Sequence, residues 1–188
     1  MTGTGRISHL RLALLVCAIF GLPATAAEAQ PGGQAAGRAE AEVVVPINVV
    51  QLSDLSFGSI AANGFGEASV KVAANGSPPR YVHTARPGCS GQSECLPHRA
   101  SFGVSGEANR DYRVAVPSAV MAVGARTGVG LPVVDIEVRG QNGSSATGGG
   151  RLDNAGRDTL FVGGTLRVPG GTRPDIFRAE FSVIVTYD

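Results

Sequence analysis

The chain has 188 residues, with 16 basic and 15 acidic side chains, so its net charge is close to zero. This balance excludes the strongly basic surface that nucleic-acid-binding domains need. Glycine (27 residues) and proline (11) are abundant, and tryptophan is absent. Because each glycine weakens a helix interior by about 1 kcal/mol, the composition favours short strands joined by turns over long helices.

Residues 1–29 have the pattern of a secretory signal peptide. Positively charged side chains precede an apolar run over 12–22, and small residues follow up to Ala29. The pattern predicts cleavage after Ala29, with Ala26 as the second choice. A membrane anchor is the alternative, but the apolar run of about eleven residues is too short to cross a bilayer, which takes about 20. Cleavage also removes Cys17.

The rest of the chain divides into a leader and a folded domain. Residues 30–42 have no apolar pattern and predict a flexible leader. Residues 43–188 carry the strand patterns and predict one domain. We therefore expect an exported protein, in the periplasm, at the cell surface or outside the cell, without a membrane span after signal cleavage.

The first half of the domain shows short stretches typical of strands. Val43–Leu52 is rich in β-branched residues, and Pro46 within it indicates an edge strand or a bulge. Residues 55–60 continue the alternation with a glycine kink. Apolar residues alternate again over 68–72, and Asn75-Gly76 then predicts a tight turn.

Two cysteines, Cys89 and Cys95, remain after signal cleavage. An isolated cysteine pair in an exported protein predicts a disulfide, which at this short spacing stabilises the fold by about 2–3 kcal/mol. His83 and His98 flank the pair, so a zinc site and a cysteine nucleophile paired to a histidine are alternatives. Because the spacing matches no common zinc motif, we favour the disulfide and expect neither a metal nor another cofactor.

Alternation continues through the second half and is clearest at the end of the chain. Strands are predicted over 100–104, 112–116, 134–138, 160–168 and 177–187, with a bulge at Gly163-Gly164. No helical periodicity occurs outside the signal. Eight or nine antiparallel strands therefore predict a single immunoglobulin-like β-sandwich. The expected core consists of Leu55, Phe57, Val70, Val72, Phe102, Val104, Tyr112, Val114, Val116, Ile136, Leu160, Val162, Leu166, Phe181, Val183 and Val185.

Acidic residues supply two further candidates for chemistry. Asp135 and Glu137 are spaced to share one strand face, as a pair of glycosidase carboxylates would, with Val134, Ile136 and Val138 on the other face. A solvated outer face is the simpler interpretation. A cluster around Gly156 offers oxygen ligands for calcium but forms no complete calcium loop, so we favour a turn there. Its members are Asp153, Asn154 and Asp158.

Several stretches carry a family resemblance. They are Leu55-x-Phe57-Gly58, Phe102-x-Val104-x-Gly106 with Tyr112, Phe161-Val162-Gly163-Gly164-Thr165-Leu166-x-Val168-Pro169, and Phe181-Ser-Val-Ile-Val-Thr-Tyr187. In this order they resemble the bacterial secreted family catalogued as domain of unknown function 4402, over roughly Val43 to Tyr187. The resemblance implies an exported immunoglobulin-like sandwich with no assigned activity.

More distantly, the chain is similar to subunits of chaperone–usher pili, particularly the spore-coat-U type. Those subunits also begin with a Leu-x-Phe-Gly element and end in an alternating strand with a penultimate aromatic residue. This resemblance implies assembly by strand addition, with a periplasmic chaperone or like subunits as partners. The implied partner contacts are Phe181, Val183, Val185 and Tyr187.

These observations predict a non-enzymatic structural or adhesive surface protein. The chain lacks a G-x-S-x-G elbow, a phosphate-binding glycine loop and an H-E-x-x-H motif. A periplasmic ligand- or glycan-binding module is the alternative, and it needs a concave patch of aromatic side chains drawn from Tyr81, Tyr112 and Tyr187. A hydrolase that uses Asp135 and Glu137 is the third hypothesis.

Overall fold

The computed structural model describes residues 36–89, 95–143 and 148–188, in two units, Met1–Ala41 and Glu42–Asp188. The predicted signal peptide (1–29) and the start of the predicted leader (30–35) lie outside the described residues. Residues 36–41 are exposed and belong to no helix or strand. None of the described segments is a helix long and apolar enough to span a membrane.

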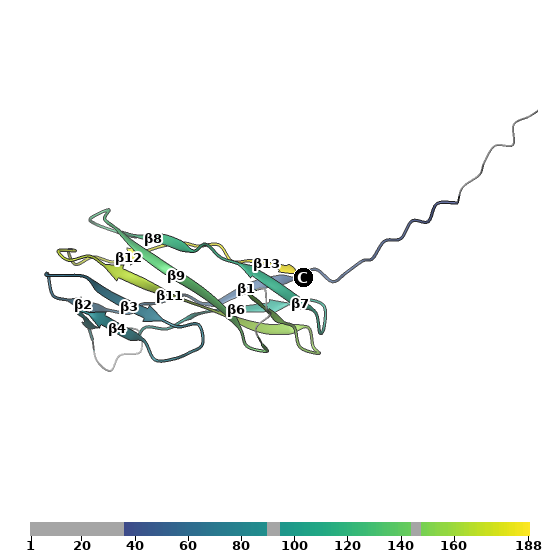
Figure 1. Cartoon of the computed structure of the whole chain (residues 1–188), viewed down its shortest axis with the longest axis horizontal. Helices are drawn as coiled ribbons and strands as arrows, with labels where there is room; N and C mark the ends of the chain where they lie inside the picture. The colour runs from purple at the N-terminus through teal and green to yellow at the C-terminus, as the bar shows by residue number, and fades with distance from the viewer. Residues whose placement is uncertain (1–35, 90–94, 144–147) are drawn as a thin grey trace, which may run out of the picture. The chain divides into compact units, whose positions relative to one another are not determined.

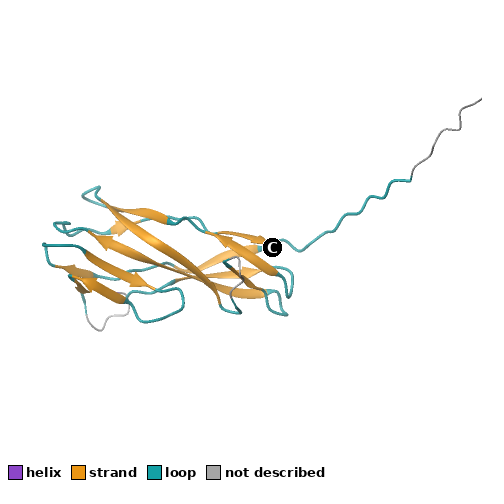
Figure 2. Ribbon diagram, in the orientation of Figure 1, coloured by secondary structure: helices purple, strands orange, loops and turns teal. Residues whose placement is uncertain are grey.

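The second unit is built of β-strands, and its described residues contain no α-helix (Figure 2). The predicted all-β class is confirmed. More strands occur than the eight or nine expected, because segments of two or three residues are too short for alternation to reveal. The described strands are β1 (Asn48–Ser53), β2 (Ile60–Ala62), β3 (Ala68–Val72), β4 (Arg80–His83), β5 (Ala85–Pro87), β6 (Ala100–Ser105), β7 (Asp111–Ala115), β8 (Ala119–Gly124), β9 (Gly130–Gly140), β10 (Gly149–Arg151), β11 (Arg157–Val168), β12 (Phe177–Arg178) and β13 (Ile184–Tyr187).

The strands form an antiparallel β-sandwich (Figure 1). The largest sheet has the order β1-β6-β11-β9-β8-β12, and β3 and β4 extend it beside β11. A second sheet has the order β10-β7-β13, and β2 pairs with β5. Every pairing is antiparallel, and among the described strands β1 pairs only with β6. The predicted edge strand is therefore confirmed, but it begins at Asn48 and not at Val43, so Pro46 lies just before it.

Strand β11 is the central element of the large sheet. Along one edge it pairs with β6 through residues 157–162 and then with β3 through residues 164–168, while β9 follows its other edge. Gly163 stands at the change of partner, where a Cβ atom would lie 2.4 Å from the carbonyl oxygen of Val72. Only glycine fits this close backbone approach.

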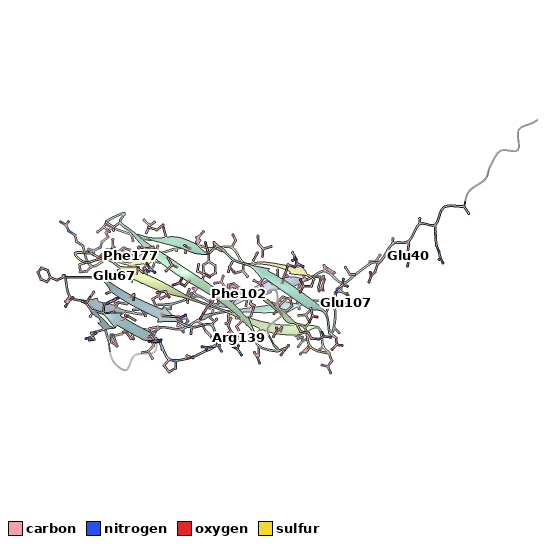
Figure 3. All side chains as sticks on the ribbon, in the orientation of Figure 1. Glu40, Glu67, Phe102, Glu107, Arg139 and Phe177 are labelled. Carbon is pink, nitrogen blue, oxygen red and sulfur yellow. A yellow bond between two sulfur atoms is a disulfide. The ribbon has the colours of Figure 1, made fainter. Side chains whose placement is uncertain are left out.

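Two clusters of apolar side chains fill the sandwich, and Figure 1 shows their strands toward opposite ends of the second unit. Ile136 packs against both. The first core is centred on Ala68, Val70, Ala85, Ala122, Leu131, Val133, Leu166 and Val168. The second core is centred on Ala100, Phe102, Val104, Tyr112, Leu152, Leu160 and Val162. Figure 3 labels Phe102 near the middle of the domain.

The predicted bulge occurs in the β9–β11 ladder, where the register shifts between Gly163 and Thr165. The additional residue is on β9, where Asp135 has a left-handed backbone (φ 52°). An extra residue reverses which side chains face inward. The prediction that Val134 shares a face with Ile136 and Val138 is therefore wrong. Leu131 and Val133 are buried instead, at 1% and 4% exposure, and neither was expected in the core.

The other predicted core residues are all buried or half-buried, but the fully buried Leu152 and five buried alanines were not expected. Val116 belongs to neither core, because the chain turns at Val116–Ser118 between β7 and β8. The predicted final strand is also not continuous. It consists of β12, which pairs with β8, and β13, which pairs with β7, joined by residues 179–183 outside any ladder. The segment thus passes from one sheet to the other.

Candidate functional site: the open edges of β1 and β13

In the terminal segment, residues 177–187, half-buried and exposed side chains alternate from Phe181 to Tyr187, as the sequence predicts. Phe181, Val183, Val185 and Tyr187 are half-buried and pack against the second core. The residues between them are exposed, with Ile184 at 58%. The predicted partner contacts therefore form one row directed at the chain's own core. Their contact with a partner stays a prediction.

Strands β1 and β13 are both unpaired on one side. In the described part of the chain, β1 pairs only with β6 and β13 pairs only with β7. Strand direction alternates across the large sheet, so β1 and the terminal segment run antiparallel. An unpaired edge presents free backbone donors and acceptors to another strand.

The same two edges cover the second core incompletely. Ile47 and Val49 come from the β1 side, and Val183 and Val185 come from the β13 side, and all four are only half-buried. No backbone ladder joins the two strands. These four side chains form an apolar row that is only partly shielded from solvent, and an added strand would bury it.

Tyr187 makes the contact that crosses from one edge to the other. Its hydroxyl donates a hydrogen bond to the carbonyl oxygen of Val45 (2.8 Å) and accepts one from the backbone N–H of Glu107 (2.7 Å). Gly106 makes room for this hydroxyl, since a Cβ atom there would lie 2.1 Å from it. The two ends of the folded domain therefore meet at one side chain.

Charged groups surround this contact. The Arg110 guanidinium lies 4.8 Å from the centre of the Tyr187 ring and donates to Glu107 (2.6 Å). That hydrogen bond raises the pKa of Arg110, and the negative charges of Glu107 and Glu42 act in the same direction. Figure 3 labels Glu107 at the end of the domain where β13 finishes. Glu42, just before the apolar segment Val43–Ile47, is thus electrostatically coupled to the same corner.

The cysteine segment forms the predicted disulfide between Cys89 and Cys95. Gly58, the expected kink, has φ 67°, and a Cβ atom there would lie 2.3 Å from the carbonyl oxygen of Cys95. His98 pairs with Ser56 through backbone hydrogen bonds, and His83 ends β4. The described residues contain no group of three or more His, Cys, Asp or Glu side chains placed to hold a metal ion.

Two of the carboxylates singled out in the sequence, Glu137 and Asp153, have structural partners. Glu137 accepts a hydrogen bond from the Ala74 N–H (3.0 Å) and lies 3.5 Å from the Lys71 ammonium. Asp153 accepts from the N–H groups of Ala155 and Arg157, as a turn residue does. Residues 153–156 therefore form a turn, as favoured from the sequence, whereas Asp158, the third member of the cluster, lies in β11.

Asp158 has a role that its sequence position does not suggest. It is 7% exposed and accepts hydrogen bonds from the Tyr112 hydroxyl (2.7 Å) and from the N–H groups of Asn142 (3.0 Å) and Thr159 (2.7 Å). Burial and the hydrogen bond to Asp158 raise the pKa of Tyr112 well above its usual value. This buried pair ties β7 to β11.

Asp175 was not predicted as a structural residue. Its side chain is 1% exposed and binds the N–H groups of Arg126 and Thr127 and the Thr127 hydroxyl. Desolvation opposes ionisation, but these hydrogen bonds and the Ile176 N–H hold the pKa of Asp175 far below its usual value. The carboxylate thereby fastens the β8–β9 turn to the terminal segment.

The tyrosines do not form an exposed aromatic cluster. Tyr112 is fully buried, and Tyr81 and Tyr187 pack against the first and second cores. Among the described large apolar side chains, Phe65 is the exposed aromatic, at 88%. The described surface therefore offers no stacked aromatic patch of the kind that glycan binding uses.

A family model described as "Domain of unknown function (DUF4402)" matches residues 47–187. No curated protein and no solved structure matches the chain. The matched region begins at Ile47, just before β1, and ends at Tyr187, the last residue of β13. It therefore includes both open edges.

Proposed function

We propose, from the premise that this chain belongs to the DUF4402 family, that it is an exported, non-enzymatic structural or adhesive surface protein that assembles by β-strand addition. The observation that carries the proposal is the pair of unpaired edges, β1 and β13, over a half-buried apolar row. Strand addition uses backbone hydrogen bonds for affinity and side-chain sites for selection.

The chain itself contains a segment suited to be the added strand. Val43, Val45 and Ile47 alternate before β1, and no described strand pairs with them. Val43 is 96% exposed and Val45 is 56% exposed. We therefore take a second copy of this chain as the partner, with a periplasmic chaperone binding the same edge during export. The disulfide supports an oxidising compartment.

A charge placed in the apolar row tests the proposal. In the isolated subunit a lysine at Val183 can reach water from its half-buried position, but an added strand would bury it. Burying an unpaired charge is strongly unfavourable. We expect Val183→Lys to prevent self-association and chaperone binding, while Ser182→Lys, on the exposed face, leaves both intact.

The measurement is native mass spectrometry of the signal-processed chain, alone and after co-expression with a pilus chaperone. Thermal unfolding of both variants checks that each remains folded. Equal association by the two lysine variants would contradict strand addition at this edge. A wild-type chain that is monomeric and free of chaperone under both conditions would also contradict the proposal.

A further inference from the structure

Tyr187 holds the apolar segment Val43–Ile47 and the end of β13 at the same place. Its hydroxyl binds the Val45 carbonyl, 142 residues away in the chain. The Arg110 guanidinium lies over the Tyr187 ring, and the Glu107 N–H donates a hydrogen bond to the Tyr187 hydroxyl. The donor-like segment of this chain is therefore tied to its own open edge.

The Val45 carbonyl is a backbone acceptor of the kind that an added strand needs. It lies on the N-terminal side of β1, and a strand paired to an edge would stand about 4.8 Å away and use such acceptors. The contact to Tyr187 is made by a side chain across the space between the edges, and no ladder joins β1 to β13. An incoming strand competes with this bond.

The contact is suited to opening reversibly. It joins two neutral groups at an exposed position, and such a hydrogen bond contributes little net stability. The other restraints on the ring, Gly106 and Arg110, do not involve Val43–Ile47. Opening therefore frees residues 43–46 without disturbing the fold of β13, while Ile47 stays packed against the second core.

We propose that Tyr187 is a latch that slows the assembly of the isolated subunit. While the hydroxyl binds Val45, Val43–Ile47 is held back as a donor strand, and the donor strand of another copy cannot enter beside β13. The donor segment and the edge of β13 both become available when this one bond opens. The inference rests on the proposed strand addition and adds a control point to it.

The test compares wild type with Tyr187→Phe, which keeps the ring and removes the hydroxyl. Limited proteolysis of the full signal-processed chain with elastase, which cleaves after small apolar residues such as valine, is followed by mass spectrometry. We expect cleavage within residues 43–47 to become about two- to ten-fold faster, as the loss of one exposed neutral hydrogen bond allows. Cleavage within β9 and β11 should stay unchanged. Tyr81→Phe is the matched control, because its hydroxyl makes no hydrogen bond with the described residues.

Assembly is measured on the same proteins as the rate of uptake of a fluorescent peptide with the sequence of residues 42–50. Uptake by Tyr187→Phe should be faster than uptake by wild type by a similar factor. Gly106→Ala, which displaces the hydroxyl by a different route, should reproduce the change if it remains folded. Thermal unfolding of each variant establishes folding.

The outcomes separate the latch from the strand-addition proposal. Measurable but equal uptake by wild type and Tyr187→Phe overturns the latch and leaves strand addition in place. An unchanged rate of cleavage within residues 43–47 in Tyr187→Phe overturns the latch as well. Absence of uptake by both proteins, together with absence of self-association, refutes strand addition and with it the control assigned to Tyr187.

Discussion

The buried hydrogen bond between Tyr112 and Asp158 allows a quantitative prediction. Tyr112→Phe keeps the fully buried ring and removes the donor to Asp158. A hydrogen bond to a charged group contributes about 1.5–3 kcal/mol to stability. The carboxylate retains its N–H donors from Asn142 and Thr159, so the loss should stay within that range. For a domain of this size, the unfolding midpoint should fall by about 3–12 °C.

Urea unfolding followed by circular dichroism measures this change directly, with Tyr81→Phe as control. Tyr81 is half-buried against the first core, and its hydroxyl has no hydrogen-bond partner in the described part of the chain. The control should therefore change stability by less than about 0.5 kcal/mol. A loss below about 0.5 kcal/mol for Tyr112→Phe would refute the assigned role of the buried bond.

The same tyrosine predicts a dependence on alkaline pH. Its pKa is raised from the usual 10.0 in the folded state, so the unfolded chain loses this proton first. The stabilisation from the neutral phenol is complete below about pH 10 and falls as pH rises above it. Wild type should therefore lose stability with pH by up to about 1.4 kcal/mol per unit more steeply than Tyr112→Phe. Parallel curves for the two proteins would contradict this account.

Three further variants test other parts of the fold. Because the pKa of Asp175 is lowered in the folded state, the stability that its carboxylate contributes is present above the unfolded value near 3.8 and is lost as pH falls. In Asp175→Asn the unfolding midpoint should therefore fall less steeply as the solution is made acidic. Replacing Cys89 and Cys95 together by alanine should lower the free energy of unfolding by about 2 kcal/mol, measured in urea, because the pair closes a short loop. Asp135→Gly should keep or raise the unfolding midpoint, whereas Asp135→Val should lower it, because the left-handed backbone there disfavours a β-branched side chain; a lower midpoint for the glycine variant would contradict the bulge.

Local alternation identified the β-class and many of the large core side chains because it depends only on neighbouring residues. It failed at β9, where the inserted Asp135 reversed the inward face, and Leu131 and Val133 were missed. An acidic residue inside an apolar strand was the available signal for a bulge. Alternation also did not predict that the last strand divides into β12 and β13. The division arises because the segment first pairs with β8 and then with β7, and such pairing depends on where distant strands lie.

The candidate site was only partly visible in the sequence for the same reason. The alternating end of the chain predicted an interaction strand that includes Tyr187, and its contact with a partner stays a prediction. The contacts of Tyr187 with Val45 and Gly106 join residues that are far apart in the chain. No short-range pattern reports such pairs. Asp175 was missed because a single aspartate after a proline has no distinctive spacing.

Strand β11 contributes side chains to both cores, and this affects how the domain unfolds. Its first half carries Leu160 and Val162 into one core, and its second half carries Leu166 and Val168 into the other. Because both cores share β11, neither core should unfold while the other holds this strand folded. We therefore expect the whole domain to unfold cooperatively. Tyrosine signals from Tyr81 and Tyr112, which report on opposite cores, should then disappear in a single transition.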